Sequence, residues 1–184
     1  KRIRAAEGAF AEGDVPTAIR LLKSGIADNP QDPTLRFSLG RIHLMSGSLR
    51  EAEEDFRIAE LNGQPRRKVL PLRAQVWLGM GGDSRALREL EGESYSGDEE
   101  AIRLSLLSRA YLMKAQLTEA SRRIEAAKQI NPLLSEVILA EVEFLLAKGE
   151  PARAEALIDE MLGQNPDNLE ALASTADLRR VGGD

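Results

Sequence analysis

Cysteine is absent from this sequence, and histidine and aromatic residues are scarce. The 184 residues include no cysteine, one histidine and only 4% aromatic residues. Without cysteine there is no disulfide, no thiol nucleophile and no zinc–thiolate site. A single histidine also argues against metal sites that need a histidine pair. We therefore expect no metal ion, no cofactor and no catalytic residues. Because there is no cysteine, the sequence does not indicate whether the protein resides in a reducing or an oxidising compartment.

The chain also lacks an excess of positive charge and a long apolar run. It carries 25 basic and 30 acidic side chains, for a net charge of −5, so a strongly basic nucleic-acid binder is not expected. Its 42% hydrophobic and 30% charged residues are typical of a folded domain. No stretch approaches the roughly 20 apolar residues of a membrane span. Because Lys1 opens the chain in place of Met, we expect a fragment of a longer protein.

A repeat of 34 residues organises the sequence. One column of the repeat is alanine, the next is a large apolar residue four positions later, and a third is mostly glycine. The alanine column is Ala18, Ala52, Ala86, Ala120 and Ala154. The apolar column is Leu22, Phe56, Leu90, Ile124 and Ile158. The glycine column is Gly13, Gly47, Gly81, Gly149 and Gly183, with Ala115 in the fourth place.

Each column has a physical reason in a helix–turn–helix repeat. Small residues let two helices approach closely, and the larger ones fill the space between repeats. The glycine column falls at the end of each first helix, where a left-handed backbone conformation strongly favours glycine. Asn29-Pro30, Asn131-Pro132 and Asn165-Pro166 end the second helices, because a residue before proline avoids the α conformation.

This pattern resembles the tetratricopeptide repeat, or TPR, over essentially the whole chain. The second repeat matches best, with Leu39-Gly40, Gly47, Ala52 and Phe56. The resemblance implies an all-α fold, a right-handed TPR superhelical solenoid of about five and a half repeats. Residues 1–184 would form a single array with repeats at approximately 1–32, 33–66, 67–98, 99–134 and 135–168, and a partial repeat at 169–184.

The coarse pattern predicts eleven helices and one irregular repeat. The helices are expected over 2–12, 15–28, 33–46, 49–62, 67–80, 83–91, 99–114, 117–130, 134–148, 151–163 and 167–181. The third repeat is irregular, because Gly92 shortens its second helix, 94–98 reads as a loop, and Pro71 falls inside its first helix. A local change in superhelix pitch explains this irregularity, and contact of Tyr95 with a partner is the alternative.

The resemblance also places a partner-binding groove along the first helices, at helix positions 2, 5, 9 and 12. The candidate groove residues are Phe37, Arg41, Leu44, Gln75, Leu78, Ser105, Arg109, Leu112, Leu139 and Glu143. Such a surface would suit an extended or helical peptide with apolar anchors and a few acidic residues. Packing between repeats is the alternative role for the leucines, and a structural role is the alternative for Arg41 and Arg109. The Lys/Asn clamp with which some TPR domains hold a terminal carboxylate is absent.

Two other features have structural explanations. His43 stands where the repeat usually has a large residue, so we expect a packed, partly buried histidine. Glu51, Glu53, Glu54 and Asp55 crowd one helix, and we expect them to form a solvated face.

The order of irregularities from Leu39 to Leu72 is similar to one bacterial subgroup, the long TPR proteins of PEP-CTERM/exosortase-linked exopolysaccharide loci. That resemblance implies a secreted or lipid-anchored scaffold, periplasmic or outer-membrane-anchored, with a cytoplasmic location as the alternative.

We therefore expect a non-catalytic protein–protein interaction scaffold that binds a peptide or helix in its groove. An accessory TPR domain of a larger enzyme and a self-association module acting through the end helices are the alternatives. The expected partner is a protein or peptide and not a nucleic acid, and we expect no membrane span in this fragment.

Overall fold

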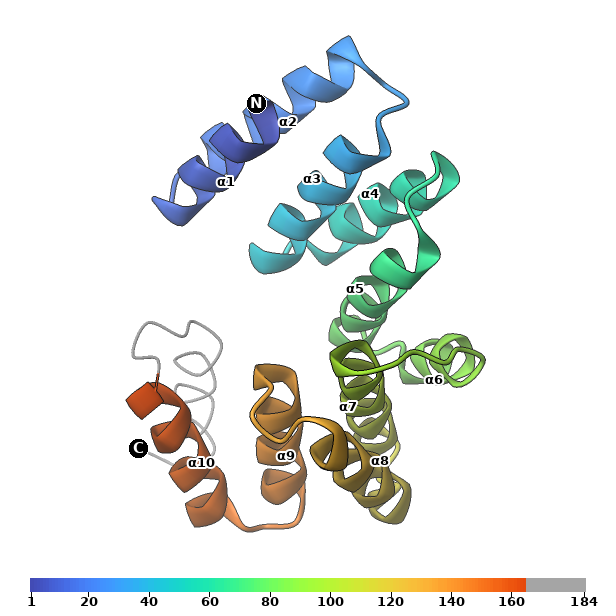
Figure 1. Ribbon diagram of the computed structural model, residues 1–184, viewed down its shortest axis with the longest axis vertical. Coiled ribbons are helices and arrows are strands. Elements are labelled where there is room, and N and C mark those ends of the chain that lie inside the picture. Colours follow the sequence, from blue (N-terminus) through green and yellow to red (C-terminus); the bar gives the residue numbers. More distant parts are fainter. Residues whose placement is uncertain (165–184) are drawn as a thin grey trace. The chain divides into compact units, whose positions relative to one another are not determined.

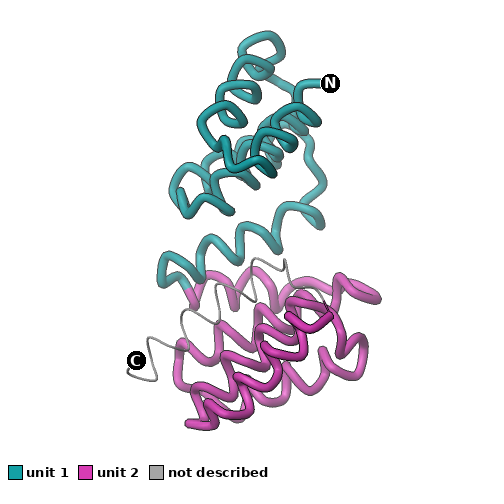
Figure 2. Tube along the Cα trace, turned by 90° about the vertical axis from the view of Figure 1, so that its left-hand side faces the viewer, with its two compact units in different colours: residues 1–82 teal, residues 83–184 magenta. Residues whose placement is uncertain are grey.

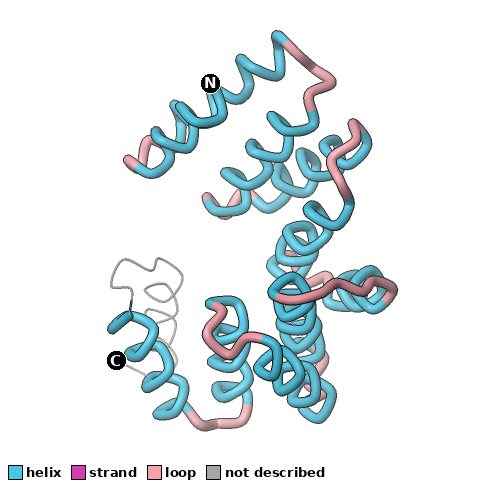
Figure 3. Tube along the Cα trace, in the orientation of Figure 1, coloured by secondary structure: helices cyan, strands magenta, loops and turns pink. Residues whose placement is uncertain are grey.

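The structure, a computed structural model, describes residues 1–164, and this part of the chain contains ten α-helices and no strand (Figures 1 and 3). In chain order the helices are α1 (Arg2–Ala11), α2 (Val15–Asp28), α3 (Pro33–Met45), α4 (Leu49–Leu61), α5 (Arg66–Gly79), α6 (Asp83–Glu91), α7 (Asp98–Met113), α8 (Leu117–Ile130), α9 (Ser135–Ala147) and α10 (Pro151–Gln164). All ten agree closely with the helices expected from the sequence. The helix expected over 167–181 lies outside the described residues.

The chain divides into two compact units (Figure 2). Unit 1 is Lys1–Gly82 and contains α1 to α5, and unit 2 begins at Asp83 and contains α6 to α10. The division falls inside the irregular third repeat. A single array over residues 1–184 stays a prediction.

Helix starts are set by local side chains. Asp14 accepts a hydrogen bond from the Thr17 amide at 3.0 Å, which satisfies one of the free N–H groups at the start of α2. Asp32 does the same for α3 with the amides of Thr34 and Leu35, at 2.8 and 3.3 Å. These side-chain caps therefore start α2 and α3 at residues 15 and 33, as the sequence predicts.

The turns that end the first helices adopt the left-handed conformation that the glycine column predicts. Gly13, Gly47, Gly81 and Gly149 have φ values of 82°, 76°, 79° and 76°. Ala115, at the same place in the fourth repeat, has a φ of 56° and is the one non-glycine residue with positive φ among the residues described. An L-residue pays a steric cost in this conformation that glycine avoids.

The core of unit 1 depends on small residues where helices cross. Ala18, Ala52 and Ala59 are fully buried. A Cβ added to Gly40 would lie 2.8 Å from the Phe56 ring, closer than real Cβ contacts come. Close approach of α3 and α4 therefore requires glycine here, because Phe56 fills the space a side chain would need.

The core of unit 2 repeats this design in two clusters. One joins α7, α8 and α9 through residues such as Leu104, Ile124 and Ala140, and the other joins α9 and α10 through Val142 and Ile158. Ser108 takes the small-residue position in α7, and its buried hydroxyl donates a hydrogen bond to the Ala120 carbonyl at 3.0 Å. The polar group is thus satisfied inside the core.

The third repeat is irregular as expected. Helix α6 ends at Glu91 and an irregular segment leads to α7. Helix α5 runs from Arg66 to Gly79 with Pro71 inside it, in agreement with the helix predicted over 67–80.

A buried arginine ties α6 and the loop to α7. Arg103 donates one hydrogen bond to the Leu90 carbonyl at 2.9 Å and two to Glu100, at 2.8 and 2.6 Å. Glu100 also accepts from the Tyr95 amide at 3.1 Å. The Arg103 hydrogen bonds, followed by the Tyr95 amide, lower the pKa of Glu100 despite its partial burial.

Candidate protein-binding surface

Within each unit, the first helices of the repeats contribute to a face that we call the first-helix face of that unit. These helices are α1, α3 and α5 in unit 1, and α7 and α9 in unit 2. Within unit 1, α3 contacts both α1 and α5, and within unit 2 α7 contacts α9. Every candidate groove residue belongs to one of these helices. On α3 they are Phe37, Arg41 and Leu44; on α5, Gln75 and Leu78; on α7, Ser105, Arg109 and Leu112; on α9, Leu139 and Glu143.

The candidate residues differ in exposure. Arg41 is exposed, and most of the others are half-buried. Leu78 and Ser105 are buried, with 6% and 1% of their surface exposed. The Ser105 hydroxyl donates to the Ala101 carbonyl of its own helix at 2.9 Å. These two side chains therefore do not face solvent.

Several apolar candidates also pack against the core. The Phe37 ring lies 5.8 Å from the Phe56 ring, centroid to centroid, in a tilted arrangement. Phe37 and Leu44 both pack on the cluster that contains Phe56 and Val76. Leu139 packs on the cluster of α9 and α10. Phe37, Leu44 and Leu139 thus help to hold neighbouring helices together, while their half-exposed parts remain at the surface.

The two candidate arginines form ion pairs with the neighbouring repeat. In unit 1 the Arg41 guanidinium lies 3.8 Å from the Glu7 carboxylate. In unit 2 Arg109 donates from Nε to Glu143 at 2.8 Å. Arg109 and Glu143 are 34 residues apart, as are Glu7 and Arg41, so each pair joins equal positions of adjacent repeats. The opposite charges 34 residues apart are a signal in the sequence that could have predicted both pairs.

The expectation of a solvated acidic face on α4 is wrong for Asp55. Asp55 is buried, and its two carboxylate oxygens lie 2.8 Å from His43 Nδ1 and 2.9 Å from an Arg36 terminal nitrogen. Both partners belong to α3. Burial of a carboxylate needs such partners, since an unpaired buried charge is costly. His43 is accordingly a packed histidine, as expected, but it is packed against a charge.

Glu53 is half-buried and is likewise not fully solvated. The buried Arg73 of α5 donates two hydrogen bonds to Glu53, at 3.1 and 2.8 Å, and a third to Glu60. The Arg73 guanidinium also stacks over the Trp77 ring, 5.0 Å from its centroid. Burial by itself lowers the pKa of Arg73, but the two glutamates outweigh it and raise that pKa. The network links α4 to α5 inside unit 1.

Residues 1–164 bring together no group of three or more His, Asp or Glu side chains that could hold a metal ion. None of the helices described has the length and apolar character that crossing a bilayer requires.

Comparison with known proteins supports the repeat pattern directly. Residues 9–76 match the sequence profile of the tetratricopeptide repeat. A thermophilic TPR protein of Thermus thermophilus, TTC0263, superposes with a TM-score of 0.73 at 20% identity, over 96% of each chain. The all-α architecture, the 34-residue spacing and this superposition agree. The chain has the TPR fold.

Two other solved structures are similar in fold. Pseudomonas aeruginosa PilF matches with a TM-score of 0.68 at 18% identity, over all of this chain and 83% of its own. YrrB, described as a TPR protein with an unusual peptide-binding site, matches with a TM-score of 0.61 at 15% identity, over 95% of this chain and 90% of its own. No curated protein sequence matches the chain. At these identities the likeness concerns the fold alone.

The profile match over residues 9–76 gives the general class of protein that this chain resembles. TPR proteins are in general protein-interaction scaffolds, and proteins of this fold are typically non-catalytic. The all-α TPR fold expected from the sequence is confirmed.

Proposed function

We propose that this TPR chain is a non-catalytic scaffold that binds a peptide or helix of another protein on its first-helix face. The observation that carries the proposal is the composition of this face. In each unit it sets an arginine that is about one-third to one-half exposed beside half-buried apolar side chains, Arg41 beside Leu44 and Arg109 beside Leu112. Apolar anchors with a few charged contacts are the usual requirements of peptide recognition.

The ion pairs on this face are compatible with ligand binding. Exposed pairs contribute only about 0–1 kcal/mol to stability, because water and salt screen them. A carboxylate of a partner would therefore compete with Glu7 for Arg41, or with Glu143 for Arg109, at little cost to the fold. The peptide-binding site attributed to YrrB supports the same type of function on this fold.

The proposal is tested by a charge reversal on the first-helix face. The double variant Arg41→Glu/Arg109→Glu should keep its helical content and lose capture of the partner, which affinity purification and mass spectrometry from native-host extracts would identify. The matched control is Arg20→Glu/Arg122→Glu, which makes the same charge change at exposed positions of α2 and α8.

Partner capture that survives the first double variant, or is lost equally in the control, would remove the first-helix face as the binding site. A loss of helicity in the first variant would instead assign those arginines a structural role.

We further propose a role in a bacterial envelope assembly linked to exopolysaccharide production. This proposal rests on the similarity of residues 39–72 to the TPR proteins of exopolysaccharide loci. Parallel capture from envelope and cytosolic extracts tests the periplasmic or outer-membrane location. A partner found only in the cytosolic extract would contradict it.

A further inference from the structure

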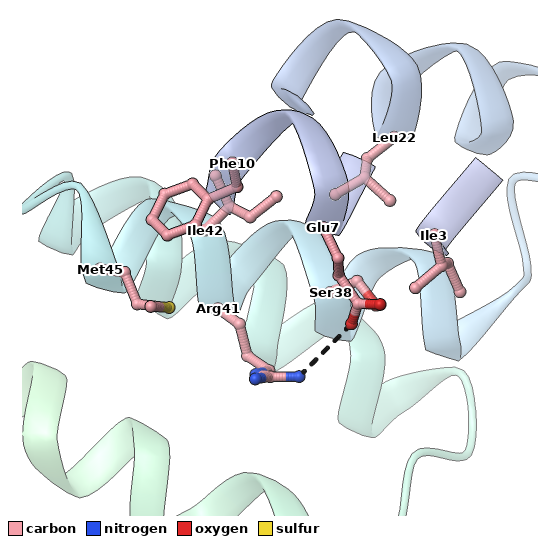
Figure 4. A pocket seen from close by; sticks show the side chains of 8 residues that line it. All are labelled: Ile3, Glu7, Phe10, Leu22, Ser38, Arg41, Ile42 and Met45. Atoms are coloured by element: carbon pink, nitrogen blue, oxygen red, sulfur yellow. Dashed lines mark ion pairs between the residues drawn. The ribbon is translucent and has the colours of Figure 1, made fainter. Parts of the chain in front are cut away.

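Unit 1 contains a small apolar pocket on the first-helix face, between α1 and α3. Its volume is about 260 Å³, and Figure 4 shows the side chains that line it. Ile3 and Phe10 of α1, Leu22 of α2, and Ile42 and Met45 of α3 form the apolar wall. Pockets that hold drug-sized ligands or cofactors measure about 300–1,000 Å³. This one suits a single large side chain.

The rim of the pocket carries a weak ion pair. Glu7 and Arg41 face each other across it at 3.8 Å, and both side chains are about half exposed (Figure 4). Among residues 1–164, the Arg41 guanidinium forms no hydrogen bond and no other ion pair. Its donors therefore remain open to a stronger acceptor.

The surroundings of the pocket are positively charged. A second depression shares Ile3 and Glu7 with the pocket and adds Lys1 and Arg4. Neither Lys1 nor Arg4 forms an ion pair with any residue in the described part of the chain. Three cations thus surround one carboxylate, which favours an acidic ligand over a basic one.

We propose that this pocket takes a large aliphatic or aromatic side chain of a peptide partner, and that a carboxylate next to this anchor replaces Glu7 at Arg41. The inference rests on the proposed function and names the chemistry of its partner: an apolar anchor within an acidic segment. Desolvation of the anchor supplies affinity, and the cations select the acidic sequence.

Methionine methyl groups provide a local test. Met45 lines the pocket, whereas Met80, Met113 and Met161 do not and serve as internal references. The probe is a short, end-capped peptide with a central leucine flanked by glutamates, added to methyl-labelled protein up to about 1 mM. We expect a saturable shift of the Met45 methyl resonance. Peptides with alanine for the leucine, or lysine for the glutamates, should bind about tenfold more weakly or not at all.

A matched pair of variants tests the location independently. Met45→Trp fills the pocket, and Met113→Trp makes the same change at the last residue of α7, two repeats further on. Both positions tolerate a large side chain, since Met45 is 58% and Met113 49% exposed. In fluorescence anisotropy with the labelled leucine–glutamate peptide, Met45→Trp should weaken binding at least about tenfold and Met113→Trp should leave it unchanged. Glu7→Gln should strengthen binding at low salt, because it frees Arg41.

The outcomes separate this inference from the proposed function. A peptide that shifts Met80 or Met113 and still binds Met45→Trp would leave the first-helix face as a binding surface and overturn the pocket. Preference for the lysine peptide would overturn the acidic partner. A Met45 shift that grows with protein concentration in the absence of peptide would place a second copy of the chain in the pocket. No shift at Met45 up to about 1 mM would also overturn the inference, while the capture experiment would still judge the proposed function.

Discussion

Replacing Ala115 by glycine should stabilise the protein by about 0.5–1 kcal/mol. Ala115 has a φ of 56°, while the corresponding turns of the other described repeats use glycine. The hydrogen bonds of these turns are alike. The Ala115 amide donates to the Leu112 carbonyl at 2.8 Å, and the Gly47 amide to the Leu44 carbonyl at 3.0 Å. The strain at Ala115 is therefore conformational and does not come from missing bonds.

The magnitude follows from two opposing terms. An L-residue in the left-handed region costs about 1–2 kcal/mol, which glycine avoids. Glycine gives the unfolded chain extra freedom, which costs about 0.4–1 kcal/mol. Ala115 is exposed, so no buried methyl group is lost. The difference should raise the melting temperature by about 1–4 °C in a chain of this length.

Gly47→Ala is the matched opposite change. Gly47 has a φ of 76°, and a Cβ there would meet no heavy atom within 4 Å, so the cost is conformational alone. Urea and thermal unfolding followed by circular dichroism should show Ala115→Gly above and Gly47→Ala below the parent protein by similar amounts. An Ala115→Gly variant of equal or lower stability, with Gly47→Ala destabilised, would refute the strain assigned to Ala115.

Three further changes test other parts of the fold. Ala52→Leu should overpack a fully buried helix contact and cost about 1–3 kcal/mol in urea unfolding, and an unchanged midpoint would contradict the repeat register. Arg73→Met should cost about 1–3 kcal/mol by the same assay, because it removes the three hydrogen bonds from Arg73 to Glu53 and Glu60, and a neutral result would mean that these bonds add nothing to stability. Glu100→Gln should be less stable than the parent at neutral pH, where the carboxylate with its lowered pKa is charged and bound to Arg103. That difference should persist down to the unfolded-state pKa of about 4.3 and fade as the pH drops through the lower folded-state pKa, so a constant difference at pH 3 would contradict it.

Local signals explain why the helices could be predicted so closely. Helix starts such as α2 and helix ends such as Gly47 depend on residues within one turn of the boundary. The columns of the 34-residue repeat also predicted which helices pack together, because alanine and glycine recur where helices cross. The end of α6 at Glu91 followed from Gly92 in the same way.

Tertiary contacts explain what the sequence did not reveal. Asp55 lies among acidic residues on α4, and nothing in its own helix indicates that Arg36 and His43 of α3 bury it. For the first-helix face, the repeat register located the candidates, but the exposure of each depends on neighbouring helices. This is why Ser105 is buried and Arg41 is not.

The ion pairs between equal positions of adjacent repeats mean that the order of the repeats matters. Each pair needs opposite charges on two neighbouring copies of the same motif, as in Glu7 with Arg41 and Arg109 with Glu143. A gene duplication that placed two copies of the second repeat side by side would set one arginine against another. A copy of the fifth repeat beside itself would oppose two glutamates. Tandem duplication of one repeat would therefore replace an attractive pair by a repulsive one at this position, a change on the order of 0–1 kcal/mol, unless a compensating substitution accompanied it.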